Sequence, residues 1–457
     1  MRLISKRPAT ERHLAASRSV TRGRKQGWGG GRVLSVLASS AMVLGLVGAN
    51  TVLNAGSGPA GASSPALTVS ENSIDFGSVT LGDFKPAAFV ITNTSTSVDT
   101  ISALTEFIAP GPAFLFGPTQ GSCQDSPLGT ITLSSGESCT ATFDFEPNSL
   151  GPASATLNIE DSLNSDESVS MSGTGVTGYY QVASKGDVIN RGDAANYGTA
   201  ASFPLIHPIV GIAPTGDDGG YWLAASDGGV FSYGNAKYFG STGALALKAP
   251  IVGISATDDA EGYCLVAADG GVFNYGDAPF EGSTGDLTLN APIVGMAHTS
   301  LFDGYWLVAS DGGVFAFGFA NFFGSMGGMH LNAPIVGMAP APDNKGYWLV
   351  ASDGGVFAFG SAKFFGSTGS LHLNQPIVAM SAMPDGNGYW LSAADGGLFN
   401  YGDAPFEGSS VGMAYSGKIV AMANDGLPTF QGEFGYPALK GTETPSRLLN
   451  GKRRDSG

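Results

Sequence analysis

The chain has 457 residues, which is enough for two or three domains. It carries 38 Asp or Glu against 22 Lys or Arg, for a formal net charge of −16. A body this acidic repels phosphate backbones, which argues against a nucleic-acid partner.

The N-terminal region has the layout of an export signal. Residues 1–32 hold nine Lys or Arg and one acid, Glu11, and residues 33–47 form an uncharged apolar run. This pattern predicts a basic leader and signal peptide over residues 1–62. The apolar run is short for a bilayer span of about 20 residues. We expect a secreted or cell-surface protein that contacts a membrane only if this segment is not cleaved.

Residues 66–176 alternate apolar and polar side chains between Gly, Pro, Asn and Ser, which predicts a separate all-β domain. Five motifs follow one another along this domain: IDFGSVTLGD (74–83), FVITNTS (89–95), SSGESCTATFDFEP (134–147), LGPASATLNI (150–159) and VSMSGTG (169–175). Together they resemble the choice-of-anchor D family, which is related to the ASH (abnormal-spindle/hydin) immunoglobulin-like domains. The resemblance implies a seven-stranded sandwich that serves as a spacer or interaction module without catalysis.

Two of the three cysteines, Cys123 and Cys139, flank one segment of this domain. An exported chain meets an oxidising environment, so we predict a disulfide between them.

A repeat of 42 residues organises the rest of the chain. A Gly-Tyr pair begins at Gly178, Gly220, Gly262, Gly304, Gly346 and Gly388, with no insertion or deletion between copies. Each unit of such an array buries its apolar face only against its neighbours. Cys264 takes the place that Trp has in four other copies, which favours a small buried apolar residue over a reactive thiol.

One repeat, residues 335–376, contains four strand-like runs: IVGMA, GYWLVAS, VFAFG and KFFGS. Asp353-Gly354-Gly355 between the second and third is a hairpin signal. Four short strands in 42 residues fit a β-propeller blade, and IVGMA, with its small residues, is the natural innermost strand.

The phase of the repeats predicts how the ring closes. Five blades are complete, while residues 178 to about 200 lack an inner strand and Ile419 to Asn424 supply one without the rest. We therefore predict a six-bladed propeller over residues 178–426 whose last blade is built from both ends. The alternative is a β-solenoid. Residues 440–457 are predicted to be a disordered basic tail.

The repeats also resemble Gly-rich repeats with the pattern GYWLVASDGGVFxFG in secreted proteins of high-GC Gram-positive bacteria. That resemblance implies a location at the cell surface or in the medium, and no general activity.

One Asp per blade precedes the Gly-Gly turn: Asp227, Asp269, Asp311, Asp353 and Asp395. Five carboxylates on one rim suggest a calcium site, because calcium prefers several oxygen ligands. The alternative is that each Asp shapes only its own turn. No other cofactor is expected.

Recurring aromatic residues, such as Tyr221, Trp222, Phe231, Tyr238 and Phe239, are interpreted as packing between blades rather than as a sugar site. Ligand-binding candidates are residues that vary among constant repeats. Those in the connectors before each Pro-Ile-Val are Lys248, Asn290, His330, Asn332, His372 and Asn374.

The sequence contains no metal-ligand spacing of histidines, no Gly-x-Ser-x-Gly elbow and no phosphate-binding loop with Lys. We therefore expect an exported, non-catalytic binding or scaffold protein whose partner is a cell-wall glycan or a surface protein. The alternatives are an extracellular glycan hydrolase or lyase with carboxylates at the propeller mouth, and a structural envelope component.

Overall fold

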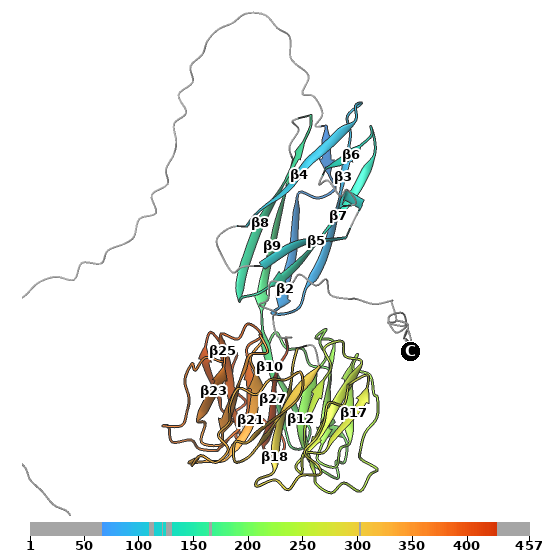
Figure 1. Ribbon diagram of the computed structural model, residues 1–457. Coiled ribbons are helices and arrows are strands. Elements are labelled where there is room, and N and C mark those ends of the chain that lie inside the picture. The colour runs from blue at the N-terminus through green and yellow to red at the C-terminus, as the bar shows by residue number, and fades with distance from the viewer. Residues whose placement is uncertain are drawn as a thin grey trace, which may run out of the picture. The chain divides into compact units, whose positions relative to one another are not determined.

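The computed structural model describes residues 66–426, apart from residues 109–113, 121, 125–129, 164–166 and 301–302. Within that part of the chain the regular elements are strands, with two single-turn 3-10 helices at Ser122–Gln124 and Ala200–Ser202 (Figure 1). Neither helix is long or apolar enough to cross a bilayer. The all-β class is confirmed, while the predicted leader and basic tail lie outside the described residues.

The first domain is a sandwich of two sheets (Figure 1). One sheet has the order β1 (Leu67–Val69), β3 (Lys85–Asn93), β7 (Ser138–Pro147) and β5 (Phe114–Gln120). The other has the order β2 (Ser73–Thr80), β9 (Glu167–Val176), β8 (Gly151–Asp161), β4 (Asp99–Ile108) and β6 (Ile131–Leu133). The described residues thus form nine strands, two more than the family resemblance implies, and the two three-residue strands β1 and β6 are both at sheet edges.

Alternation along the strands builds the sandwich core. In β7 the side chains of Cys139, Ala141, Phe143 and Phe145 point inward and are almost fully buried. Phe143 stacks on Phe89 of β3 at 5.8 Å between ring centres. The predicted disulfide is confirmed, because Cys123 of the first 3-10 helix is bonded to Cys139. It ties that turn to β7, one of the two inner strands of the sheet.

The second domain is a propeller of six three-stranded sheets (Figure 1). Five blades consist of consecutive strands: β12 (Ile209–Pro214), β13 (Gly220–Ala225) and β14 (Val230–Gly234); β15 (Ile251–Ala256), β16 (Gly262–Ala267) and β17 (Val272–Gly276); β18 (Ile293–His298), β19 (Gly304–Ala309) and β20 (Val314–Gly318); β21 (Ile335–Pro340), β22 (Gly346–Ala351) and β23 (Val356–Gly360); β24 (Ile377–Ala382), β25 (Gly388–Ala393) and β26 (Leu398–Gly402).

The sixth blade joins both ends of the domain, as predicted. Its sheet has the order β11 (Val188–Gly192), β10 (Gly178–Ala183) and β27 (Ile419–Asn424). Tyr179 pairs with Asn424 and Tyr180 with Ala423 in antiparallel register. The β-solenoid alternative is therefore excluded.

The first strands of the blades form the inner wall of the ring. β12, β15, β18, β21, β24 and β27 contact one another in that cyclic order. Small residues are needed where the strands come together: a Cβ added to Gly211 would lie 3.0 Å from Cγ2 of Ile254 in the next blade. The middle strand of every blade is buried along its whole length. The core of the domain therefore lies between the blades.

The prediction of a fourth strand per blade is wrong. The outer segment of each blade, for example residues 237–242, is irregular and belongs to no sheet. Side chains hold it instead. The indole of Trp222 donates to the carbonyl of Lys237 at 2.7 Å. The hydroxyl of Tyr263, from the next blade, donates to the carbonyl of Gly240 at 2.6 Å. The backbone groups that a strand ladder would use are thus bonded to side chains of two blades.

Candidate functional site

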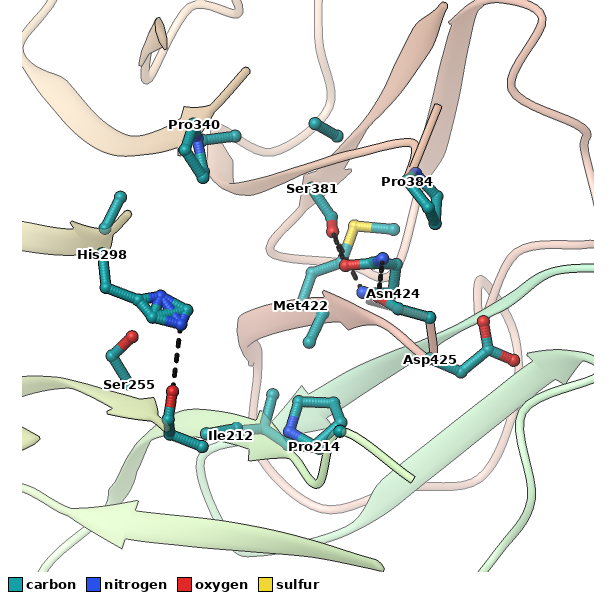
Figure 2. A pocket seen from close by; sticks show the side chains of 18 of the residues that line it. Ile212, Pro214, Ser255, His298, Pro340, Ser381, Pro384, Met422, Asn424 and Asp425 are labelled. Carbon is teal, nitrogen blue, oxygen red and sulfur yellow. Dashed lines mark hydrogen bonds between the residues drawn. The ribbon is translucent and has the colours of Figure 1, made fainter. Parts of the chain in front are cut away.

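A pocket of about 220 Å³ opens at one end of the central channel of the propeller (Figure 2). The C-terminal ends of the inner strands and the loops that follow them line it. All six blades contribute, so the pocket exists only because the ring is closed.

The lining consists of successive rings of residues at equivalent positions in the repeats. The deepest ring of residues is apolar, although its members differ between blades. It consists of Ile212, Ile254, Met296, Met338, Met380 and Met422. Two residues further along, the ring is Pro214, Ala256, His298, Pro340, Ala382 and Asn424. At the mouth, five blades contribute Gly216, Asp258, Pro342, Pro384 and Gly426. The pocket is therefore mostly apolar. Its polar groups, such as His298, Ser381 and Asn424, differ from blade to blade.

His298 is the most prominent of these polar groups (Figure 2). Its Nε2 lies 3.0 Å from the carbonyl oxygen of Ala256, which only accepts, so Nε2 carries the proton. The carboxylate of Asp258 is 3.8 Å from the same nitrogen. The imidazole is 20% exposed, and burial lowers the pKa of His298 to about 4. The ring is therefore neutral at pH 7.

Asp258 stands beside His298 at the mouth of the pocket. Burial, with a contribution from the neighbouring Asp259 carboxylate, raises the pKa of Asp258 to about 7. A carboxyl with this pKa is present in both its protonated and its ionised form near neutral pH. A small change in pH therefore decides whether this carboxyl can donate a hydrogen bond or only accept one.

Across the pocket, Ser381 and Asn424 form a fixed polar pair (Figure 2). The Ser381 hydroxyl donates to the Asn424 side-chain oxygen at 3.0 Å and accepts from the Asn424 backbone N–H at 3.0 Å. The Asn424 amide nitrogen donates to the carbonyl of Gly426 at 2.6 Å. These bonds hold both side chains in one orientation.

Asp425 connects the pocket to the closure of the ring. Its carboxylate accepts a 2.7 Å hydrogen bond from the backbone N–H of Gly178, the first residue of β10. Burial raises the pKa of Asp425 to about 6. The lining includes two acidic residues, Asp258 and Asp425, and no Lys or Arg.

The ligand candidates chosen from the sequence lie elsewhere in the repeat. Lys248, Asn290, His330, Asn332, His372 and Asn374 are all exposed on connectors that lead into the inner strands. The pocket is lined by the opposite ends of those strands, and none of the six residues borders it. The structure therefore does not bring them together at this site.

The five Asp residues before the Gly-Gly turns are also kept apart. Each accepts a hydrogen bond from the backbone N–H two residues later within its own turn, as Asp227 does from Gly229 at 3.0 Å and Asp353 from Gly355 at 2.9 Å. Asp269, Asp311 and Asp395 repeat this contact. Across the described part of the chain, no three His, Cys, Asp or Glu side chains gather in a group that could hold a metal ion.

Sequence reasoning missed His298, Asp258, Ser381 and Asn424. The signal that would have found them is the one applied to the connectors: a position that varies while the repeat is otherwise constant. His298 takes a place where four other blades have Pro or Ala and the sixth has Asn424. What the sequence did not reveal was which end of the inner strands opens as a pocket.

No family model and no curated protein matches the chain. Among solved structures, the ASH/PapD-like domain 7 of human CEP192 is similar over 24% of this chain and 86% of its own length, with 16% identity and a TM-score of 0.19. The β-propeller domain of Myceliophteria thermophila Cps50 (Swd1) is similar over 55% of this chain and 87% of its own, with 10% identity and a TM-score of 0.32. The fold assignment itself rests on the strand order described above.

Proposed function

We propose that this chain is an exported, non-catalytic binding protein that holds its ligand in the pocket at the end of the propeller channel. The observation that carries the proposal is the distribution of constant and variable residues. Residues shared by the repeats, such as Tyr221 and Leu223 of β13, are fully buried between blades. Residues that differ between blades, such as His298 and Asn424, line the pocket.

The pocket restricts the ligand by size. Pockets for drug-sized molecules have volumes of about 300–1,000 Å³. A cavity of about 220 Å³ accommodates a smaller group, such as one sugar ring or one long side chain. We therefore propose that it receives the end of a cell-wall glycan or a projecting side chain of a surface protein.

The pocket also restricts the ligand by charge. Its walls offer apolar contacts from the deepest ring of Ile and Met side chains. They also offer acidic groups from Asp258 and Asp425, and a neutral His298. An anionic ligand would meet no compensating charge there. We expect an uncharged or cationic group with an apolar face.

Two features support export. The basic leader followed by an apolar run is typical of secretory signals. The disulfide between Cys123 and Cys139 is of the kind that persists in oxidising compartments. We place the protein at the cell surface or in the medium, with the immunoglobulin-like domain as spacer.

Catalysis is the competing function, because a hydrolase also needs carboxylates at the propeller mouth. A glycosidase pairs a protonated acid with an ionised carboxylate. Here burial raises the pKa of both Asp258 and Asp425, and Asp425 is engaged by the N–H of Gly178. Because the Asp425 carboxylate is held by the closure of the ring, we favour binding over hydrolysis.

The test is binding of peptidoglycan fragments, cell-wall polysaccharides and basic peptides, measured by calorimetry with product analysis alongside. His298→Ala should weaken binding at least tenfold, whereas His330→Ala, an exposed histidine outside the pocket, should leave it unchanged. If only the His330 variant lost binding, the ligand would bind at the connectors and not in the pocket. New products would establish an enzyme. Absence of every ligand, together with self-association in light scattering, would favour a structural envelope role.

A further inference from the structure

One aromatic position of the repeat is not explained by packing. Five blades place a large ring at this position of the outer segment, and each ring is about 60% exposed: Tyr238 59%, Phe280 61%, Phe322 59%, Phe364 59% and Phe406 58%. The sixth blade has Asn196 there. The interpretation that all recurring aromatic residues pack between blades is therefore wrong for this position.

The neighbouring residue shows the contrast. Phe239 packs edge-on against Tyr263 of the next blade, with 5.8 Å between ring centres. Phe323 and Phe365 make the same contact with Tyr347 and Tyr389. In these three blades the second aromatic residue packs at the interface between blades and the first faces solvent. In the other two blades Glu281 and Glu407 follow the exposed ring.

The exposed ring is presented on a fixed backbone. On one side of Tyr238 the carbonyl of Lys237 is held by Trp222, and on the other the carbonyl of Gly240 is held by Tyr263. Other blades repeat both bonds: Trp348 holds Lys363 and Tyr389 holds Gly366 on either side of Phe364. Ordering these rings on a ligand therefore costs little backbone entropy.

A second, partly exposed aromatic ring lies beside four of the five positions. A Cβ added to Gly240 would lie 2.6 Å from Cδ1 of Tyr275, so that ring covers the glycine closely. Gly282 with Phe317, Gly324 with Phe359 and Gly366 with Tyr401 repeat this arrangement. At the fifth position Gly408 faces the side chain of Arg191 instead. Four of the five sites thus consist of an exposed ring beside a second aromatic ring that covers a glycine at the junction of two blades.

The chemistry favours a sugar polymer over other partners. One face of a pyranose ring carries C–H groups that pack on an aromatic face, while its hydroxyls stay in water. A protein interface requires about 800 Å² of contiguous surface on each partner, and single rings on separate blades do not supply it. The domain from 178 to 426 has 21 Asp or Glu and seven Lys or Arg, so it repels polyanions.

We propose that these five aromatic positions are repeated stacking sites for an uncharged polysaccharide. Repetition is the central point: a ligand with a repeating unit can occupy several equivalent sites at once. Each site alone is weak, and linked engagement raises the overall affinity by avidity. This surface is separate from the pocket at the end of the channel, so it stands or falls independently of that site.

The experiment uses cellohexaose and chitohexaose in solution, and cellulose and chitin as insoluble polymers. Saturation-transfer NMR with irradiation of aromatic protons should transfer signal to the sugar C–H protons of a hexasaccharide, and far less to glucose or N-acetylglucosamine. On the polymers, Phe322→Ala and Phe364→Ala should each lower affinity about threefold, and the double variant about tenfold.

Two controls separate this proposal from the pocket and from misfolding. Phe319→Ala removes a ring that is 79% exposed at a different repeat position, and it should bind like the wild type. None of the five exposed rings borders the pocket, so a loss of binding in the Phe322 and Phe364 variants does not arise from the pocket lining. All variants should melt at the wild-type temperature. The proposal is overturned if none of the four glycans binds, or if they bind equally to the Phe322/Phe364 double variant.

Discussion

The phenol of Tyr179 donates a 2.5 Å hydrogen bond to the carbonyl of Gly408, 229 residues further along the chain. The same bond joins Tyr221 to Gly198 and Tyr263 to Gly240 between consecutive blades, each across 23 residues. The ring is therefore closed by the contact that is used between its other blades. The first tyrosine of the propeller serves the last outer segment.

Removing one of these hydroxyls should destabilise the propeller. Tyr263→Phe leaves the carbonyl of Gly240 without its donor, and we expect a loss of about 1–3 kcal/mol in the free energy of unfolding. Tyr179→Phe should cost a similar amount, because it breaks the same bond at the closure. Urea denaturation measures both, with the exposed Tyr238→Phe as a control that should change nothing. If Tyr263→Phe lowered the free energy of unfolding and Tyr179→Phe did not, the hydrogen bond of Tyr179 would not contribute to closing the ring.

The strand that completes the sixth blade should be as important as any other inner strand. Ile419 of β27 and Ile335 of β21 occupy the same repeat position, and both are fully buried. Replacing either by Ala should cost about 2–5 kcal/mol, the usual range for a cavity of this size. The comparison is made by calorimetry on the two single variants. If Ile419→Ala costs much less than Ile335→Ala, the C-terminal strand frays and the ring is open at that seam.

The repeat phase was enough to predict this closure, since an inner strand without a blade and a blade without an inner strand imply each other. The outer segment was not predicted. KFFGS has the composition of a strand, but the carbonyls of Lys363 and Gly366 bond to Trp348 and Tyr389 instead of to a neighbouring strand. The strand propensity of a segment reflects how well its residues fit a pleated surface. It contains no information on which side chains of other blades compete for hydrogen bonds to its backbone.

The site was predicted less well, for a geometric reason. In both the connectors and the pocket, a residue differs from blade to blade at one position of an otherwise constant repeat. Only the folded ring shows that His298 and Asn424 converge on one cavity while His330 and His372 stay exposed and apart from it. A side chain on one blade gains its neighbours from other blades, and their distances depend on closure.

Cys264 offers a test of how one repeat compensates for a missing tryptophan. In the neighbouring copy, Trp306 donates to the carbonyl of Asn321 at 2.7 Å. Where Cys264 replaces the indole, the amide of Asn274 donates to the equivalent carbonyl, that of Pro279, at 2.5 Å. Asn274→Ala should therefore cost about 1–3 kcal/mol, because that carbonyl is left without its donor.

The double variant Cys264→Trp with Asn274→Ala recreates the Trp306 and Ala316 pair of the next blade. It should recover stability relative to Asn274→Ala alone, so the two changes are expected to be strongly non-additive. Denaturation of the two single variants and the double variant measures the coupling. Additive losses would mean that the surrounding core, not the donor, decides which residue is tolerated.

The pocket carboxyl should make stability depend on pH with an unusual sign. Burial raises the pKa of Asp258 to about 7 from an unfolded value of about 3.9, so the folded protein binds more protons than the unfolded chain between about pH 4 and pH 7. The stability that this group contributes is present at low pH and is lost as pH rises through that window. His298 acts in the opposite direction, because its lowered pKa makes the unfolded chain bind more protons between about pH 4 and pH 6.5.

Comparing Asp258→Asn with the wild type isolates the carboxyl, because His298 is present in both proteins. The melting temperature of the Asn variant should rise relative to the wild type as pH goes from 4 to 7, since the variant no longer loses stability by ionising a buried group. Thermal melts at half-unit pH steps measure the difference. A flat difference for Asp258→Asn would mean that this carboxyl ionises as freely in the folded protein as in water, and that the pocket mouth carries a full negative charge when the ligand arrives.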